Sequence, residues 1–523
     1  MGVQILVNFH AIMNSSNQVR IGDYQPNAFS NTYMRRSHKW HAQLIISLII
    51  IGSVLFAAHA DASVVTYPAP SDGIPLSSDF AVTADGQHVD VYQVKVSRQF
   101  SGYTPCPTSY EVAAMAYFDF SGTVNVQITS AVPVSTVTIR PLRHNIQPAI
   151  NGNTISFSLS HPANLSIEIN GDDRHNLHLF ANPREQKVPS PSDPNILYFG
   201  PGVHGNGSGI GLEAEKTVYI AGGAIIYGYF YNANAANTAT IRGRGILSGE
   251  KTSKDPCPGN GGASLISSNT VKNLTLEGFI GVDASSWAYT INNTDSFYMD
   301  NIKYIDWRGN DGLDLLSTSQ ATIKNTFIRS NDDAFAIKSD PYFITPTHRP
   351  SENIVIQDSV SWPDGAGHAI AFMEQSTPYI RNVQIKNIDI VHAYAPAVYF
   401  ICCDLNPGEQ YHVTLNDVRV EDMKFNAIFE FDGHGSGNNI RDVYINNFSL
   451  LGGNVAPSKI SGTHSSAVSN ITFNNLNYLG RDILNASDGQ FNISGNTSNI
   501  AFTHGSRTSP PNPTPTPRGV ACQ

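Results

Sequence analysis

The chain has 523 residues and a formal net charge of −10; 41% of its residues are hydrophobic and 14% are charged. The low charged fraction excludes a disordered acidic or basic chain and argues against a long charged coiled coil. The sequence shows no basic footprint, so we expect no nucleic-acid partner.

Residues 34–60 have the organisation of a secretory signal peptide. Its parts are a basic cluster, an apolar run and a small-residue cleavage signal: Arg35, Arg36 and Lys39; residues 44–56; and Ala58-His59-Ala60. A membrane anchor is the alternative, but the apolar run is short for a span of about 20 residues. We therefore expect a secreted protein, extracellular or periplasmic, with no stable membrane insertion after cleavage.

The two ends of the chain lie outside the expected folded part. Met34 directly precedes the basic cluster, which indicates that translation starts there and that residues 1–33 are an over-extended gene start. The mature chain would then begin near Asp61. Residues 505–523 are rich in proline and predict an extended, solvated tail.

The cysteines are too few for a disulfide scaffold and too scattered for a zinc site. They are Cys106, Cys257, Cys402, Cys403 and Cys522. Cys106 and Cys257 are candidates for a disulfide after export, although the sequence does not pair them. Cys402 and Cys403 are neighbours, and a bond between them would be strained.

Residues 61–188 predict an antiparallel β-sandwich. Apolar and polar residues alternate with period 2 in short runs, as in Val124-Asn-Val-Gln-Ile-Thr and Leu165-Ser-Ile-Glu-Ile-Asn. Strands spaced about 8–12 residues apart are typical of a sandwich. Nothing in this stretch indicates catalysis, so we expect a role in packing or in contact with a glycan.

Residues 189–504 predict a parallel β-helix. A strand phrase such as Val383-Gln-Ile-Lys-Asn-Ile recurs eight times, with successive spacings of 24, 24, 33, 29, 30, 30 and 28 residues. Such self-similarity is the signature of stacked coils, each covering the strand edge of the one before. The residues aligned at the predicted corner, where Asn and Asp tolerate left-handed backbone angles, are Glu277, Asn301, Asn325, Asp358, Asn387, Asp417, Asn447 and Asn475.

Two successive coils carry carboxylates at matching positions. Asp311 precedes the pair Asp332–Asp333 by 21 residues, close to one coil, so the three side chains should converge on one face. His368 follows in the next coil and would tune the acid. Glycoside hydrolysis needs one protonated and one ionised carboxyl group, and crowding of like charges pushes pKa values apart. Corner residues or a calcium site are the alternatives, because isolated Asp-Gly and Asn-Asp pairs are usually turns.

The motifs Asn310-Asp311, Asp332-Asp333 and Gly367-His368 resemble, in this order, the catalytic motifs of the polygalacturonases, which are family 28 glycoside hydrolases. The resemblance implies a right-handed parallel β-helix and hydrolysis with inversion. It also implies that Asp332 is the general acid, that Asp311 and Asp333 activate the water, and that His368 supports the acid. Inversion would separate the carboxyl groups by roughly 6.5–9.5 Å.

Two departures from the polygalacturonase pattern concern the substrate. Ala369 replaces the glycine that follows the histidine, and Ala395-Pro-Ala-Val-Tyr399 stands where an Arg-x-Lys motif would grip the substrate carboxylate. Lys338 or Arg381 would have to supply the missing cation. Pectic galacturonan is therefore one of two candidate substrates.

A second resemblance, to the dextranase and isopullulanase family (family 49), rests on architecture. A sandwich precedes the runs that start at Ile196, Val218 and Gly243, as in those hydrolases of neutral α-glucans. This resemblance implies the same roles for the three aspartates but gives none to His368. A neutral α-glucan such as dextran or pullulan is nearly as favoured as galacturonan.

Aromatic residues near the aspartates are candidates for stacking on sugar rings, with packing as the alternative. The predicted substrate-binding residues are Trp287, Trp307, Trp362, Tyr399 and Lys338. Glu250 and Glu374 are reserve acids, and His204 is expected to be structural.

Hydrolysis by these aspartates requires no cofactor and no metal. A polysaccharide lyase with this fold would need calcium and a base, and a non-catalytic glycan-binding β-helix would not need the three aspartates to meet. The sequence thus predicts an all-β, secreted, monomeric glycosidase that acts on a polysaccharide, built as a sandwich followed by a right-handed parallel β-helix.

Overall fold

A computed structural model describes residues 63–98, 109–232, 236–252, 262–339, 349–365, 367–374, 379–402, 408–434 and 437–505. In these ranges the elements are strands apart from one short 3-10 helix, η1 (Leu142–His144), and no helix there is long and apolar enough to cross a membrane. The predicted gene start, signal peptide, residues 506–523, and Cys106, Cys257, Cys403 and Cys522 lie outside the described residues.

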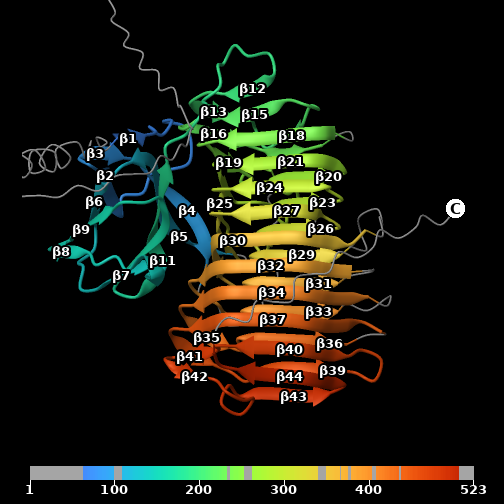
Figure 1. Cartoon of the computed structure of the whole chain (residues 1–523). Helices are drawn as coiled ribbons and strands as arrows, with labels where there is room; N and C mark the ends of the chain where they lie inside the picture. The colour runs from blue at the N-terminus through green and yellow to red at the C-terminus, as the bar shows by residue number, and fades with distance from the viewer. Residues whose placement is uncertain are drawn as a thin grey trace, which may run out of the picture. The chain divides into compact units, whose positions relative to one another are not determined.

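The first part of the chain forms two sheets (Figure 1). One contains β1 (Ser63–Thr66), β4 (Val91–Ser97), β5 (Tyr110–Ser121), β7 (Val137–Arg140), β10 (Ala163–Ile169) and β11 (Asp172–Pro183). The other contains β2 (Phe80–Ala84), β3 (Gln87–Val89), β6 (Val124–Ser130), β8 (Ala149–Asn151) and β9 (Thr154–Leu159). The alternation predicted for β6 is present, since its residues are buried and exposed in turn. One strand pair departs from the antiparallel prediction, because β11 runs parallel to β5.

The rest of the described chain is the predicted right-handed parallel β-helix (Figure 1). Its larger sheet contains β12 (Ile196–Phe199), β13 (Gly202–His204), β15 (Thr217–Ile220), β16 (Ala224–Tyr227), β18 (Ala236–Gly243), β19 (Ile246–Ser248), β21 (Val271–Glu277), β22 (Ile280–Val282), β24 (Ser296–Asp300), β25 (Lys303–Ile305), β27 (Ser319–Lys324), β28 (Phe327–Ser330), β30 (Ser351–Pro363), β32 (Tyr379–Ile390), β34 (Glu409–Val420), β37 (Asn439–Leu450), β40 (Val468–Asn474), β41 (Asn477–Tyr478), β42 (Arg481–Asp482) and β44 (Thr497–Thr503).

A second sheet runs along the coils and positions the candidate site. It contains β14 (Gly209–Gly211), β17 (Tyr229–Tyr231), β20 (Ile266–Asn269), β23 (Tyr289–Asn292), β26 (Leu313–Leu316), β29 (Phe335–Ser339), β31 (Ile370–Glu374), β33 (Val398–Cys402), β36 (Phe429–Gly433), β39 (Ser458–Gly462) and β43 (Phe491–Gly495). A small sheet pairs β35 (Met423–Asn426) with β38 (Gly453–Val455).

The core of the β-helix repeats from coil to coil. Residues at equivalent positions stack, as Phe372, Phe400 and Phe431 do with ring centroids 4.2 and 4.7 Å apart. Each coil therefore buries the apolar edge of its neighbour, as the repeat predicts.

The predicted corner has left-handed backbone angles. Seven of the eight aligned residues have φ between 52° and 57°, and Asn447 Nδ2 donates to Asp417 Oδ1 at 2.9 Å along the stack. Glu277 is misaligned by one residue, since Gly278 takes the corner with φ 86°. A second ladder, which the aligned phrase missed, has Asn470 Nδ2 donating to Asp442 Oδ1 at 2.8 Å.

The sandwich packs on one face of the β-helix through an apolar layer. Val94, Met115 and Phe180 belong to the same buried cluster as Ile305 and Phe327. Arg329 takes part in this contact: it is completely buried, its Nη1 donates to Asn176 Oδ1 of β11 at 2.9 Å, and its Nε donates to Asp364 Oδ2 at 2.7 Å.

Candidate active site

The predicted carboxylates lie where the chain enters the second sheet, at the N-terminal ends of β26 and β29. Backbone bonds hold the coils in register: Asp332 N donates to Asn310 O at 3.1 Å, and Gly312 N donates to Asp333 O at 2.7 Å. The histidine coil joins them, because Ala334 N donates to His368 O at 2.9 Å. Stacking of three coils thus places all four predicted catalytic residues together.

The three aspartates form one cluster. Each offers a carboxylate oxygen within 4.8 Å of those of the other two. Asp333 N donates to Asp311 Oδ1 at 3.2 Å and to Asp332 Oδ1 at 3.1 Å. Asp311 and Asp333 are each 3% exposed, whereas Asp332 is half-buried. Three carboxylate oxygens this close together could also bind a cation, as in the calcium site that the sequence analysis gave as an alternative.

His368 binds Asp333 twice. Its backbone N–H and its ring Nδ1 both lie 2.7 Å from Asp333 Oδ1. One face of the His368 ring stacks on Tyr399, with ring centroids 4.1 Å apart. A Cβ on Gly367 would lie 1.9 Å from the carbonyl carbon of Asp332, so only glycine lets the two coils approach this closely.

Lys338 is enclosed by the site and is 2% exposed. Its Nζ lies 2.6 Å from Asp311 Oδ2, 2.6 Å from Asp314 Oδ1 and 3.6 Å from the centroid of the Trp287 ring. The expectation that Lys338 grips a substrate carboxylate is therefore corrected: its charge is taken up by two buried carboxylates. Sequence reasoning missed Asp314, although its place between the core residues Leu313 and Leu315 of β26 puts its side chain on the other face of the strand.

The environment separates the aspartates by their affinity for a proton. Burial, and then the charges of Asp311 and Asp333, raise the pKa of Asp332 well above its usual value. Burial also acts on Asp333, but contact with His368 outweighs it and lowers the pKa of Asp333. Burial opposes the charge on Lys338, yet Asp311 and Asp314 outweigh it and raise the pKa of Lys338.

The three tryptophans predicted to bind sugar differ in their burial and their contacts. Trp287 is half-buried beside Lys338, and Trp307 is 9% exposed and packs against Tyr110 of the sandwich with centroids 5.0 Å apart. Trp362 is completely buried under the sandwich, with the Arg329 guanidinium 3.8 Å from its ring. The expectation that Trp362 stacks on a sugar is corrected to a packing role.

The remaining candidates whose side chains are described have other partners. Glu250 pairs with Lys95 of the sandwich at 2.5 Å, and Arg381 pairs with Glu352 at 2.6 Å on the larger sheet, so Arg381 does not supply the missing cation. His204 Nε2 contacts Gly200 O at 2.6 Å, which fits a structural role. The side chains of Glu374 and Cys402 lie outside the described residues.

Fold and site together define the class: a two-part all-β protein whose parallel β-helix carries an aspartate cluster on an outer sheet face. No family model and no curated protein matches the sequence. Among solved structures, Dex49A from Penicillium minioluteum is 15% identical, superposes with a TM-score of 0.61, and the match covers 84% of this chain and 96% of that one. A family 28 exopolygalacturonase from Yersinia enterocolitica is 12% identical with a TM-score of 0.44, over 84% of this chain and 96% of that one. The comparison with Dex49A supports the fold; the second superposition is too distant to add to it.

Proposed function

We propose that this protein is a glycoside hydrolase that cleaves α-glycosidic bonds within a polysaccharide with inversion. The observation that carries the proposal is the opposite direction of two pKa shifts inside one cluster: burial and the neighbouring carboxylates raise the pKa of Asp332 well above its usual value, whereas contact with His368 lowers the pKa of Asp333. Neighbouring carboxyl groups with opposite protonation are what glycoside hydrolysis requires.

In the proposed mechanism Asp332 protonates the glycosidic oxygen as the bond to the leaving sugar breaks. Asp311 and Asp333 hold the attacking water and accept its proton, and the water oxygen bonds to the anomeric carbon from the opposite side. His368 and Lys338 are positioning residues, since each acts through the carboxylate that it contacts.

A neutral α-glucan is the substrate that we favour. Lys338 is neutralised by Asp311 and Asp314, so it is unsuited to hold a uronate carboxylate. Two further observations are consistent with this choice: Tyr399 stands where the Arg-x-Lys motif was expected, and Dex49A, which shares the fold, is a dextranase.

Galacturonan is the second candidate. The observation that favours it is the His368–Asp333 contact, because the histidine belongs to the polygalacturonase motif and not to that of the dextranases. We keep as part of the same proposal that the chain is exported as a monomer, that residues 61–188 form the sandwich domain, and that residues 189–504 form the catalytic domain.

The carboxyl separation bears on stereochemistry. The 4.8 Å limit between nearest ligand oxygens is shorter than the roughly 6.5–9.5 Å typical of inversion. Inversion therefore rests on the motif resemblance, and proton NMR of the first product tests it. The anomer opposite to the substrate linkage is expected, and retention of configuration would overturn the inverting mechanism.

The deciding experiment is reducing-sugar release from dextran, pullulan and polygalacturonate by the chain from Asp61 onward. We expect Asp332→Asn to lower kcat by about 100-fold or more with an unchanged melting temperature, because it removes the general acid. Asp417→Asn, a corner carboxylate remote from the cluster, is the control. Near-normal turnover in Asp332→Asn would sink the assignment, and no release from any of the three polymers would favour a binding protein.

A further inference from the structure

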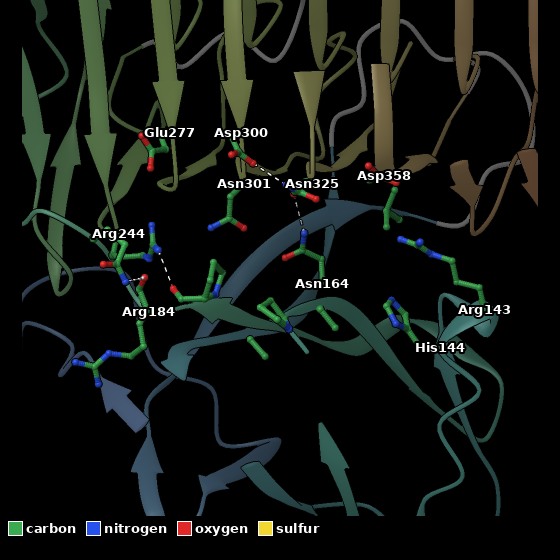
Figure 2. Close-up of a pocket in the computed structure, with 16 residues that line it drawn as sticks. Arg143, His144, Asn164, Arg184, Arg244, Glu277, Asp300, Asn301, Asn325 and Asp358 are labelled. Carbon is green, nitrogen blue, oxygen red and sulfur yellow. Dashed lines mark hydrogen bonds between the residues drawn. The ribbon is translucent and has the colours of Figure 1, made fainter. Parts of the chain in front are cut away.

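A cavity lies between the sandwich and the corner ladder of the β-helix (Figure 2). Its volume is about 490 Å³, within the range of roughly 300–1,000 Å³ typical of small-molecule sites. Asn164 of β10 forms part of its wall and donates from Nδ2 to Asn325 O at 3.0 Å.

The cavity is separate from the aspartate cluster. Asn325 lies just before β28 and Asn331 just after it, next to Asp332. The four residues of β28 span about 13 Å. The sandwich contacts both ends, since Ser97 Oγ donates to Asn331 Oδ1 at 2.5 Å on the catalytic side.

The corner ladder is interrupted at this cavity. Asn387 Nδ2 donates to Asp358 Oδ1 at 2.6 Å, and Asn325 Nδ2 donates to Asp300 Oδ1 at 2.8 Å. The link between these two pairs is missing for a chemical reason, because a carboxylate only accepts hydrogen bonds. Asp358 and the side-chain oxygen of Asn325 are therefore acceptors on adjacent coils that only an added donor can bridge.

The charges that line the cavity indicate the kind of ligand. Arg143, Arg184 and Arg244 lie among Glu277, Asp300 and Asp358, as Figure 2 shows. Arg143 is already paired with Asp389 and Arg244 with Asp119. A phosphate would therefore find little free positive charge and would meet three carboxylates, whereas a metal cation would meet the guanidinium groups, and either ion would pay a penalty for these contacts. A neutral polyol carries donors and acceptors on every hydroxyl group and meets neither penalty.

We propose that this cavity is an accessory binding site for a neutral oligosaccharide. Sugar hydroxyl groups would donate to Asp358 and Asn325 and accept from the guanidinium groups, and the C–H faces would lie against Pro183 and Val360 of the wall. The site goes beyond the proposed catalysis. Only the choice of glucan probes rests on the proposed function.

The test replaces the acceptor that interrupts the ladder beside the cavity. Asp358→Asn keeps a residue type that tolerates φ near 52° and still accepts from Asn387, but its new Nδ2 can donate to Asn325 and close the gap. Asp417→Asn is the matched control, at an equivalent corner outside the cavity. Both are made in the Asp332→Asn background so that the probe is not cleaved.

The measurement is calorimetric titration with isomaltotriose and maltotriose. The protein is made in a bacterial host, because Asn164 lines the cavity and Asn164-Leu-Ser is a glycosylation sequon. We expect two binding events in Asp332→Asn and in its Asp417→Asn derivative, and at least tenfold weaker binding at one site in its Asp358→Asn derivative. Identical titrations of all three proteins would overturn the accessory site. So would binding of inorganic phosphate or trigalacturonate that depends on Asp358. Sugar release by the wild-type protein tests catalysis separately.

Discussion

At the scale of single residues, the properties of the aspartate cluster depend on neighbouring side chains as well as on the aspartates themselves. Asp332 and Asp333 are adjacent in sequence and have the same chemistry, but only Asp333 contacts His368. This contact makes the two pKa values move in opposite directions. The motif predicted residues that lie together in the structure, whereas the opposite pKa shifts depend on a ring from the next coil.

Removing the histidine ring should change the pH profile. Because His368 lowers the pKa of Asp333, we expect His368→Ala to raise the apparent pKa of the Asp311–Asp333 pair and to move the acidic limb of kcat to higher pH. The basic limb, which reports loss of the Asp332 proton, should stay near its place. The full pH dependence of kcat is the measurement, with Tyr399→Phe as a control that keeps the stacked ring. An unshifted acidic limb would contradict this role.

Lys338 gives a prediction about stability. We expect Lys338→Met to lower the free energy of unfolding by about 3–5 kcal/mol, because Asp311 and Asp314 stay buried without their counter-charge. Adding Asp314→Asn should recover part of this loss without restoring activity. Urea denaturation and sugar release measure the two effects. Equal stability of the single and double variants would show that Asp314 carries no unpaired charge.

At the scale of elements, a turn between two strands can bury an ionisable group. Asp283, which follows β22, is 7% exposed, and burial raises its pKa to about 7 although Lys95 of the sandwich lies 3.9 Å away. The turn is therefore most stable when Asp283 carries a proton. No pattern in the sequence marked this residue, because its burial comes from the packed neighbouring coils.

Asp283 should make stability fall as the pH rises. A carboxyl group whose pKa is raised by folding stabilises the fold fully below its unfolded pKa near 4, and this stability is lost as the pH rises through about 7. We expect the wild-type protein to lose up to about 2.5 kcal/mol between pH 5 and pH 8 from this group, and Asp283→Asn to lose less. Urea melts at both pH values measure it. The same pH dependence in variant and wild type would assign the effect to other groups.

At the scale of the whole described chain, a buried ionic contact joins the sandwich to the β-helix. Arg329 Nη1 donates to Asn176 Oδ1 of β11 at 2.9 Å, and Arg174 Nη1 lies 2.6 Å from Asp364 Oδ1. Because these charges are removed from water, their partners must stay in place. The sandwich thus contributes to the stability of the coils that carry the site.

Breaking this contact should destabilise both parts. We expect Arg329→Leu to cost about 3–5 kcal/mol, since Asp364 loses one of its two arginine partners inside the protein. Differential scanning calorimetry of the variant should show a lower transition temperature for sandwich and β-helix alike. Arg98→Leu, which removes an exposed pair with Glu111, is the control. A shift confined to one part would mean that the parts unfold independently.

The sequence by itself determined the fold and the composition of the site. Period-2 strands and a corner residue recurring every 24 to 33 positions suffice, because stacking follows directly from a repeat. The spacing of Asp311, Asp332, Asp333 and His368 likewise brings them together once the coils stack. Tertiary structure decided the rest: the burial of Trp362, the ion pair between Lys338 and Asp314, and the cavity at Asp358. These features depend on which side chains of other coils and of the sandwich lie opposite, and no local pattern encodes such distant neighbours.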